Sequence, residues 1–300
     1  MDLRRIALVP KMSKYEWDRH CLGLDHEGLL AKYRQEGVDM DSILASHERQ
    51  AAALAQVQRH LQGGTLLARD EVTAAVNERF DLIISLGGDN HFQYLSHFLT
   101  TTPILGINSD VQTSVGALVP FLPEQIEALV ARLEAGDYAV EEWTRLAAWV
   151  NGRAIEWATC VYFIGEAERH FMSRHILEFR GQQEEQKGSG LLIVTGAGST
   201  GWYDSACRYR FPEGNAFAPT APWACFLLTE PYHGRLSGQA LQHGEIRPGE
   251  ELCVHSLNDD RGIISSDSIE VYSANRGTHL CVRLAPQPLR VIAMPELTER

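Results

Sequence analysis

In the first half of the chain, short apolar runs alternate with segments whose apolar residues recur at helical spacing. The apolar runs predict strands at residues 3–9, 65–68, 82–86 and 103–108. The helical spacing predicts helices at residues 13–33, 41–61, 70–80, 91–99 and 123–136. Asp41 or Ser42 could cap the second of these helices, and Gly63-Gly64 could end it. This alternation is typical of an α/β domain, Rossmann-like, with a mainly parallel sheet.

After residue 137 the pattern changes to short strand-like runs, which turn residues separate at fairly regular intervals. Two runs within residues 145–157 flank Asn151-Gly152, a strong signal for a β-hairpin. The second half therefore predicts an all-β, sandwich-like domain. We expect domains at 1–137 and 138–285, and the tail 286–300 could pack back on the first. The further predicted strands are residues 159–164, 175–179, 191–194, 225–228, 251–256, 268–272 and 280–284.

Composition narrows the classes of function. The 300 residues are 44% hydrophobic and 22% charged, values typical of a soluble globular protein. A net charge of −12 disfavours general nucleic-acid binding, which needs a basic surface, but it permits a small phosphorylated substrate. The apolar run at residues 6–9 is too short for a signal peptide, and none approaches the roughly 18 residues of a membrane span.

The cysteines indicate a reducing compartment. They contain no Cys-x-x-Cys pair, which argues against a zinc site and against the disulfide framework of a secreted protein. His170 and His175 lack an acidic third ligand at metal spacing, so we predict no metal site. A cytoplasmic location is the simplest prediction. The six cysteines are Cys21, Cys160, Cys207, Cys225, Cys253 and Cys281.

The first candidate for chemistry is the turn after the strand at 82–86. There Gly87-Gly88 leads into Asp89. Glycine lets the backbone approach a phosphate closely because it has no Cβ. The turn also places Asp89 at the edge of the sheet where ligands of open α/β folds bind. We predict that Asp89 is the acid/base of a phosphotransferase; the alternative is a plain turn with an N-capping aspartate.

The second candidate is a loop of small residues after the strand at 191–194. Its hydroxyls and backbone N–H groups suit a phosphate or a ribose. Ser199 or Thr200 could cap a helix that begins near Gly201. The loop is not a Walker A sequence, because no Lys-Ser/Thr pair follows its last glycine. An ordinary connection is the alternative here. Asp267, which follows Ser265-Ser266, is a weaker candidate.

Taken together, the two loops resemble those of the NAD kinase family. Members carry a Gly-Gly-Asp-Gly-Thr turn and a Thr-x-x-Gly-Ser-Thr-Ala-Tyr loop. This chain has Gly87-Gly-Asp-Asn-His91 and Thr195-Gly-Ala-Gly-Ser-Thr-Gly-Trp202. The likeness is closest to the mitochondrial-type branch. It continues, in one order along nearly the whole chain, through Lys11-Met-Ser-Lys-Tyr-Glu16, Gly106-Ile-Asn-Ser-Asp110 with Gly116, Tyr162-Phe-Ile-Gly-Glu166, Gln186-Lys-Gly-Ser-Gly190 and Thr229-Glu-Pro231.

The resemblance implies an NAD kinase/diacylglycerol kinase-like fold and the ATP-dependent phosphorylation of the adenosine 2′-hydroxyl of NAD, which gives NADP. Asp89 matches the family's catalytic aspartate, which accepts the hydroxyl proton as the γ-phosphoryl group arrives. Mg²⁺ would be carried mainly by the nucleotide, so no metal ligands are assigned to the protein. The resemblance also implies a homodimer built through the β domain, a small-molecule substrate, and no nucleic-acid or membrane partner.

The resemblance assigns further residues to the site. Around the turn, the glycines and Asn90 would cradle the donor phosphates, and His91 could add a titratable donor. In the second loop, Trp202 stands where the family has tyrosine and would help to hold the dinucleotide. The full set of expected nucleotide- or substrate-binding residues is Gly87, Gly88, Asn90, His91, Asn108, Asp110, Lys187, Thr195, Gly198, Ser199, Thr200 and Trp202.

The chain departs from the family pattern at two places, which leaves alternatives open. Asn90-His91 replaces Gly-Thr, and Cys160-Val161 stands where the family has the Asn-Glu pair that grips the ribose region. Each unmet hydrogen bond costs on the order of 1–3 kcal/mol. A different nucleoside, sugar or polyol acceptor, a polyphosphate donor, and a non-catalytic nucleotide-binding role therefore remain open. A Rossmann-type oxidoreductase is disfavoured, because Pro10-Lys-Met-Ser replaces Gly-x-Gly-x-x-Gly after the first strand.

Overall fold

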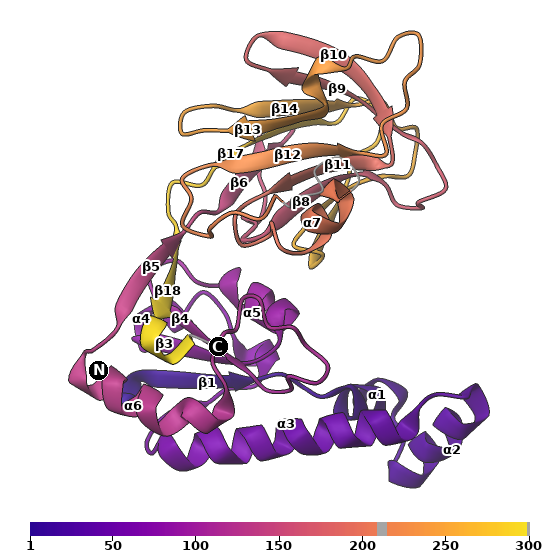
Figure 1. Ribbon diagram of the computed structural model, residues 1–300. Helices are drawn as coiled ribbons and strands as arrows, with labels where there is room; N and C mark the ends of the chain where they lie inside the picture. The colour runs from indigo at the N-terminus through magenta and orange to yellow at the C-terminus, as the bar shows by residue number, and fades with distance from the viewer. Residues whose placement is uncertain (209–214, 299–300) are drawn as a thin grey trace. The chain divides into compact units, whose positions relative to one another are not determined.

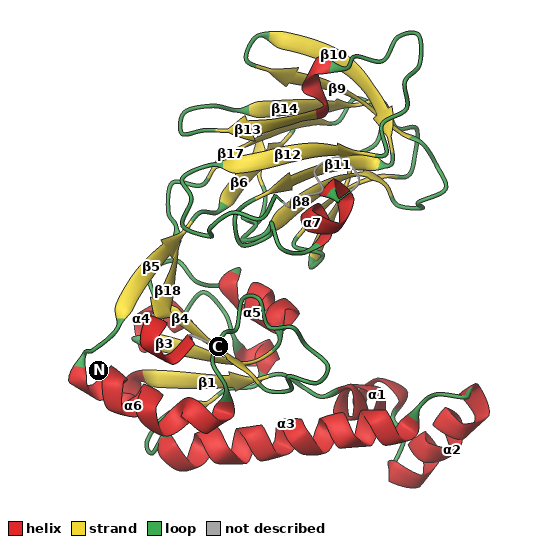
Figure 2. Ribbon diagram, in the orientation of Figure 1, coloured by secondary structure: helices red, strands yellow, loops and turns green. Residues whose placement is uncertain are grey.

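The computed structural model describes residues 1–208 and 215–298, and it divides the chain into two compact units (Figure 1). Unit 1 comprises Met1–Val140 and Arg290–Arg300, and unit 2 comprises Glu141–Leu289. Helices are concentrated in unit 1, whereas unit 2 is mostly strands (Figure 2). Among the described helices, none has the length and apolar character to cross a membrane.

Unit 1 is built on one six-stranded sheet, sheet A, with the order β2-β1-β3-β4-β18-β5. Neighbouring strands from β2 to β18 run parallel, which confirms the mainly parallel α/β domain. The parallel strands β1, β3 and β4 are buried along their length and read as continuous apolar runs, as strands covered on both faces do. The strand bounds are β1 (Ile6–Pro10), β2 (Thr65–Leu66), β3 (Leu82–Gly87), β4 (Ile104–Asn108), β5 (Ala139–Trp143) and β18 (Leu289–Ala293).

The helices of unit 1 correct three details of the sequence prediction. Residues 13–33 form two helices rather than one, because Gly23 adopts a left-handed conformation (φ 62°) after α1. The cap of α3 is Asp39, whose side chain accepts from the Ser42 N–H. Residues 70–80 contain only a 3₁₀ turn and one short helix. The bounds are α1 (Lys14–Leu22), α2 (His26–Glu36), α3 (Met40–His60), α4 (Val76–Arg79), α5 (Asp89–Ser96), α6 (Ile126–Ala135) and α8 (Pro295–Thr298), with 3₁₀ turns at Leu3–Arg5, Arg69–Glu71 and Pro123–Gln125.

The core of unit 1 lies between sheet A and the long helices. Val57 of α3 and Leu129 of α6 are fully buried in the same cluster as Leu8, Ile84 and Leu105 of the sheet. Apolar area removed from water contributes roughly 25 cal/mol per Å². The apolar stripes of α3 and α6 therefore stabilise the central strands of the sheet.

Unit 2 is a sandwich of two six-stranded sheets, as predicted. The strand orders are β10-β9-β14-β17-β6-β7 (sheet B) and β13-β12-β11-β8-β15-β16 (sheet C), with antiparallel neighbours. The prediction missed β10, whose polar sequence suits an exposed edge strand, as well as β13 and β15. The bounds are β6 (Leu146–Val150), β7 (Arg153–Ala154), β8 (Val161–Glu166), β9 (Ser173–Phe179), β10 (Gln182–Gly188), β11 (Gly190–Val194), β12 (Ala224–Thr229), β13 (His243–Ile246), β14 (Leu252–Ser256), β15 (Gly262–Ser266), β16 (Glu270–Ser273) and β17 (His279–Leu284), with one helix, α7 (Trp202–Cys207), and a 3₁₀ turn at Ala240–Gln242.

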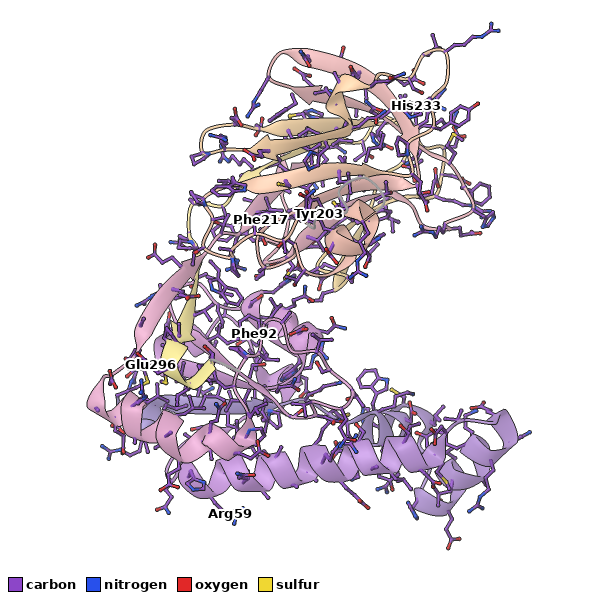
Figure 3. All side chains as sticks on the ribbon, in the orientation of Figure 1. Arg59, Phe92, Tyr203, Phe217, His233 and Glu296 are labelled. Atoms are coloured by element: carbon purple, nitrogen blue, oxygen red, sulfur yellow. A yellow bond between two sulfur atoms is a disulfide. The ribbon has the colours of Figure 1, made fainter. Side chains whose placement is uncertain are left out.

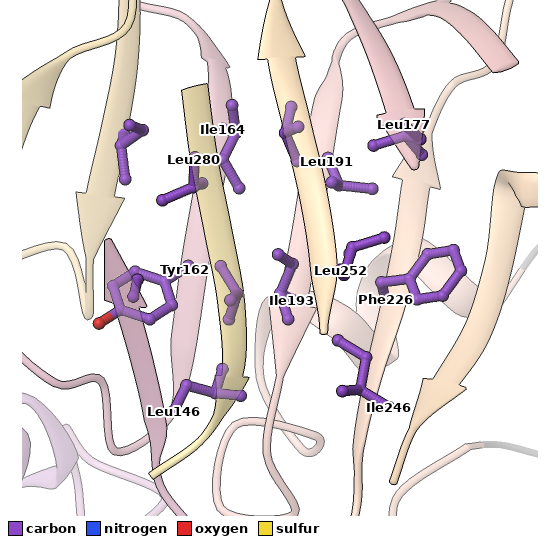
Figure 4. Close-up of a cluster of buried hydrophobic side chains, with 14 of the residues drawn as sticks. Leu146, Tyr162, Ile164, Leu177, Leu191, Ile193, Phe226, Ile246, Leu252 and Leu280 are labelled. Carbon is purple, nitrogen blue, oxygen red and sulfur yellow. The ribbon is translucent and has the colours of Figure 1, made fainter. Parts of the chain in front are cut away.

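Side chains from both sheets meet in the core of unit 2 (Figure 4). Leu177 and Leu252 come from sheet B, and Ile193 and Phe226 come from sheet C. The predicted hairpin between β6 and β7 is also present. Its two turn residues, Asn151-Gly152, have φ of 50° and 78°, the positive values that a type I′ turn requires. Local turn chemistry and alternating burial thus specify this unit together.

One sequence prediction about the cysteines is wrong. Cys253 and Cys281 form a disulfide, although they are 28 residues apart. The prediction failed because it considered only spacing along the chain, whereas the two residues lie directly opposite each other on the antiparallel strands β14 and β17. The four remaining cysteines, all within the described residues, form no disulfide.

A paired substitution tests where the core of unit 1 lies. Leu8 and Leu66 are register partners on β1 and β2, yet Leu8 is 3% exposed and Leu66 is 49% exposed. We expect Leu8→Ala to lower the free energy of unfolding by about 2–5 kcal/mol, because it leaves a cavity in the core. The matched variant Leu66→Ala should change it by less than about 0.5 kcal/mol. Urea denaturation measures both, and equal effects would contradict this packing.

Candidate active site

The Gly-Gly-Asp turn lies at the carboxyl edge of sheet A. Strands β1, β3 and β4 run parallel and end at this edge, where Gly87 pairs with Asn108 and Leu86 pairs with Pro10. Ligands of open α/β sheets bind at the carboxyl ends of the strands. The sheet thus brings the turn and Asn108 together at the edge where chemistry is expected.

Steric crowding explains both glycines of the turn. A Cβ on Gly87 would lie 2.9 Å from the Cβ of His91, and a Cβ on Gly88 would lie 2.7 Å from the Ser114 hydroxyl. Such contacts are closer than real Cβ atoms tolerate, so a larger residue would push the turn away from its neighbours. The backbone of the turn is therefore closely packed and offers no side chain between it and an approaching ligand.

Asp89 is the first residue of α5 and is partly exposed. Its carboxylate does not cap the helix, since Gly88 occupies the cap position and no side-chain cap bond forms. Instead, Oδ1 accepts from the Leu118 N–H at 2.8 Å and Oδ2 accepts from the Ala117 N–H at 3.1 Å. A carboxylate has about four acceptor positions, so these bonds fix its orientation and leave capacity for a substrate hydroxyl.

The two residues after Asp89 have different environments. Asn90 is exposed and helical, so it needs none of the tolerance for positive φ that glycine would supply. His91 is 2% exposed, and its Nε2 donates to the Val9 carbonyl at 2.9 Å. Burial, with smaller contributions from Arg69 and Lys11, lowers the pKa of His91 to about 4 despite that hydrogen bond. The expected titratable phosphate donor is therefore a neutral, inward-facing packing residue.

Asn108 holds the loop that follows β4. Its Oδ1 accepts from the Asp110 N–H, and its Nδ2 donates to the Ser114 carbonyl at 3.1 Å. A Cβ on Gly116, which has φ of 72°, would lie 2.5 Å from that Nδ2. Asn108 and Gly116 thus shape one compact loop, and Asp89 binds the next residues of the same loop.

Asp110 is a structural anchor in this fold. Its buried carboxylate accepts from Arg49 Nε at 2.7 Å and from Arg49 Nη2 at 3.0 Å, and it also accepts from the Ser46 and Thr113 hydroxyls. Burial opposes ionisation, but these hydrogen bonds outweigh it and lower the pKa of Asp110 to about 2. The charge ties the loop after β4 to α3, so its oxygens are committed within the protein.

In unit 2, the loop after β11 is held by its own hydroxyls. Thr195 and Ser199 are fully buried; Thr195 Oγ1 donates to the Thr159 carbonyl at 2.6 Å, and Ser199 Oγ donates to the Gly196 carbonyl at 2.7 Å. Ser199 Oγ also accepts from the N–H of Phe217, labelled in Figure 3. The predicted capping by Ser199 or Thr200 is wrong, because Gly201 caps α7 without a side-chain bond.

The exposed part of this loop is its end. Thr200 is exposed, and Trp202 is 41% exposed with its ring 4.9 Å from that of Phe163. Gly198 lies against the segment just before β8: a Cβ there would be 2.2 Å from the Cys160 carbonyl. Thr200 and Trp202 are thus the side chains of this loop that are accessible to a ligand, while Thr195 and Ser199 hold its shape.

Asp267 supports the segment that packs against this loop, a role for which the sequence gives only a weak signal. Its buried carboxylate accepts from the backbone N–H groups of Thr159, Cys160 and Val161 at 2.7–2.9 Å. The same three-residue segment receives the Thr195 N–H on its Cys160 carbonyl. Asp267 is 107 residues from Cys160 and belongs to no motif. The only sequence signal for its role is therefore an acid that follows a strand.

Lys187 is not brought to the second loop. It lies on β10, before the start of β11, whereas Thr195 follows the end of β11. At about 3.3 Å per residue, the five residues of β11 separate the two by roughly 16 Å. The Lys187 ammonium instead pairs with Glu185 at 3.1 Å.

Two cavities of unit 1 lie at opposite edges of sheet A. A cavity of about 420 Å³ is lined by Asn77, Pro103 and Arg290 at the amino edge of the strands, opposite the turn. A small one of about 30 Å³ lies at the carboxyl end of β1, beside Lys11 and Ser109. Neither cavity is lined by a predicted site residue, but the smaller one lies at the carboxyl edge, where the Gly-Gly-Asp turn follows β3.

Comparisons with known proteins agree with this geometry. No protein-family model matches the chain. The probable NADH kinase of Oryza sativa subsp. japonica is 24% identical over 239 residues, which are 72% of this chain and 71% of that protein. The NAD kinase of Chlorobium phaeobacteroides (strain BS1) is 29% identical over 161 residues, 52% of this chain and about half (55%) of that relative's length.

Solved structures show the same fold. The NAD kinase of Archaeoglobus fulgidus in complex with ATP superposes with a TM-score of 0.66 at 17% identity, covering 98% of this chain and 95% of that one. In sequence and in fold, this chain is similar to the NAD kinases. The yeast NADH kinase complexed with NADH gives a TM-score of 0.64 at 16% identity, covering 79% of this chain and 69% of that structure. The two-unit architecture is therefore that of the NAD kinases.

The buried His91 predicts a specific pH dependence of stability. Its pKa of about 4 in the folded chain lies below the value of about 6.5 in the unfolded chain, so the folded state favours the neutral ring. His91 contributes no penalty above pH 6.5. As the pH falls from about 6.5 to 4, the unfolded chain takes up the proton first, and His91 lowers the free energy of unfolding by about 3 kcal/mol.

His91→Gln should therefore show a shallower loss of stability between pH 6.5 and 4 than the parent chain. Urea denaturation at several pH values measures this slope. The exposed His20→Gln is the matched control and should leave the slope unchanged. An identical slope in His91→Gln and the parent chain would contradict the buried neutral state.

Proposed function

We propose that this chain is a kinase that transfers the γ-phosphoryl group of ATP to the adenosine 2′-hydroxyl of NAD or NADH and forms NADP or NADPH. The observation that carries the proposal is Asp89, a partly exposed carboxylate that two backbone N–H groups orient at the carboxyl edge of a parallel sheet. The names of the relatives and the ligands in the solved structures, ATP and NADH, support the substrates.

In this proposal, Asp89 is the general base. It accepts the proton of the 2′-hydroxyl while that oxygen attacks the γ-phosphorus and ADP leaves. Phosphoryl transfer depends mainly on in-line positioning and charge stabilisation, so a fixed base and close backbone approach are the main requirements. Gly87, Gly88 and the exposed Asn90 cradle the donor phosphates. Mg²⁺ accompanies the nucleotide, since it keeps several waters and binds phosphates readily.

The loop after β11 holds the dinucleotide. Thr200 and Trp202 make the side-chain contacts, and the indole ring offers a flat surface for an aromatic base. Thr195, Gly198 and Ser199 act by holding the loop in shape, and Asp267 acts through the segment at Thr159–Val161. This division of roles follows from exposure: Thr195, Ser199 and Asp267 are buried, whereas Thr200 and Trp202 are exposed.

The ribose contacts differ from those of the family's Asn-Glu pair. Cys160 is 2% exposed and its carbonyl accepts from Thr195, so this position supplies no hydrogen-bonding side chain to a ribose. We propose that backbone groups and Thr200 take over part of this recognition. Affinity for NAD is then weaker than a full set of bonds would give, by on the order of 1–3 kcal/mol for each unmet group.

The setting of the protein is also part of the proposal. The proposed location is cytoplasmic, because four of the six cysteines, all described, form no disulfide, although Cys253 and Cys281 do. A homodimer and the mitochondrial-type branch rest on the sequence resemblance. The net charge of −12 supports a small-molecule substrate rather than nucleic acid or a membrane surface. Light scattering of the purified chain tests the dimer.

The proposed base predicts the effect of one conservative change. Asp89→Asn keeps the side-chain shape but loses the proton acceptor, so kcat for NADP formation from Mg-ATP and NAD should fall by about 10²–10⁴-fold. A coupled assay with an NADP-specific dehydrogenase measures it. Asp81→Asn is the matched control, because Asp81 is an exposed acid that pairs with Arg5 at the start of β3. Unchanged turnover in Asp89→Asn would refute the role of Asp89 as general base.

Two outcomes of the same assay separate the alternatives. ATP consumption without NADP, together with loss of another nucleoside, sugar or polyol, would move the acceptor away from NAD. Binding of ATP and NAD without any turnover would indicate a non-catalytic nucleotide-binding protein. Replacing ATP with polyphosphate tests the donor in parallel.

A second prediction concerns the dinucleotide-binding loop. Removing a stacking ring costs roughly 1–3 kcal/mol per base, so Trp202→Ala should raise KM for NAD about tenfold while kcat changes little. Trp17→Ala is the control, because Trp17 is 53% exposed on α1. Thermal melting confirms that both variants are folded. A rise in KM shared by the two variants, or absent from both, would contradict the role of Trp202.

A further inference from the structure

Four sulfur and imidazole side chains meet on the outer face of sheet B, in unit 2. Cys253 and His255 lie on β14, and His279 and Cys281 lie on β17. The antiparallel register places Cys253 opposite Cys281 and His255 opposite His279. The strands therefore carry Cys-x-His and His-x-Cys in mirror order, and we call these four residues the Cys-His cluster.

Alternation along the strands shows which way the cluster faces. Leu252, Val254, Leu280 and Val282 are buried in the core of the sandwich. The residues between them must point to the opposite face, since successive side chains of a strand alternate. All four members of the cluster are partly exposed. A solvent ion can therefore reach the cluster without any opening of the core.

The donor atoms are close enough to share one ion. Among the described residues, the sulfurs of Cys253 and Cys281 and one ring nitrogen of His279 lie within 4.8 Å of one another. Cys281 Sγ is 3.4 Å from His279 Nε2. In a tetrahedral zinc site, bonds of about 2.3 Å to sulfur and 2.1 Å to nitrogen place the two ligand atoms roughly 3.5 Å apart.

We propose that the Cys-His cluster binds a zinc-class divalent cation when the disulfide is reduced, and that the disulfide is the metal-free state of the same site. A dithiol reductant transfers two electrons to the Cys253–Cys281 bond, giving two thiols and the oxidised reductant. Cation binding then releases two thiol protons, and both thiolates and His279 become ligands. The fourth position faces solvent and is left to water.

Neighbouring groups support a metal site over an isolated cysteine pair. The His255 ring stacks on that of His279 at 4.3 Å, and Glu178 lies 3.9 Å from His255 Nε2. Glu251 lies 3.6 Å from Cys253 Sγ. The two carboxylates lie beside His255 and Cys253 rather than against the His279 ring, and they add negative charge near a cation. Two sulfurs with one imidazole favour zinc over magnesium or calcium. The absence of a Cys-x-x-Cys pair predicts no zinc site, but ligands from two paired strands do not need that spacing.

Cobalt(II) titration of the whole chain tests the proposal. We expect the anaerobically reduced chain to bind one equivalent of Co²⁺ with a thiolate-to-cobalt charge-transfer band, and zinc to displace it. The oxidised chain should show no such band. Absence of the band in the reduced chain, or an equal band in the oxidised chain, would overturn the proposal. The readout is independent of kinase turnover, so it stands or fails separately from the proposed function.

Variants distinguish a built site from any exposed pair of thiols. Cys253→Ser should abolish the band, and His279→Ala should weaken Co²⁺ binding about tenfold or more while both thiols remain. Cys21→Ser, which removes an exposed free thiol elsewhere, is the matched control. Equal affinity in His279→Ala and the parent chain would show that the thiols alone account for binding and would refute the site.

Discussion

The hydrogen bonds from the Ala117 and Leu118 N–H groups to Asp89 are the interaction on which the candidate site depends. They turn the carboxylate away from the cap of α5 and hold it at the carboxyl edge of sheet A. The loop that provides these donors is itself fixed by Asn108 and by the ion pair of Asp110 with Arg49. A carboxylate oriented in advance loses little freedom on binding a substrate, as the proposed role of Asp89 as general base requires.

Unit 2 also contains a carboxylate that accepts hydrogen bonds from backbone N–H groups, but its role is structural. The buried Asp267 carboxylate accepts hydrogen bonds from the three backbone N–H groups of Thr159–Val161. That segment in turn receives Thr195 and crowds Gly198. A buried carboxylate with three donors is well satisfied, so the loop after β11 rests on a rigid support. The exposed Thr200 and Trp202 then have defined positions without any ligand.

Local sequence patterns predicted much of the fold, and the predictions that were wrong failed for physical reasons. The apolar runs of β1, β3 and β4 and the Asn151-Gly152 hairpin carry their own signals, so the parallel sheet and the sandwich were predictable. The polar strand β10 was not, because an edge strand needs no apolar face. The role of Asp267, the inward turn of His91 and the Cys253–Cys281 bond all depend on contacts between distant segments. Spacing along a chain cannot report such contacts.

The reaction proposed for this chain is phosphoryl transfer from ATP to the 2′-hydroxyl of NAD. The most direct test is ³¹P NMR of the purified chain with Mg-ATP and NAD, which separates a ribose 2′-phosphomonoester from free phosphate. The account predicts that the 2′-phosphomonoester resonance of NADP grows in step with ADP. Appearance of ADP with inorganic phosphate alone, or of a phosphomonoester on another hydroxyl, would contradict it.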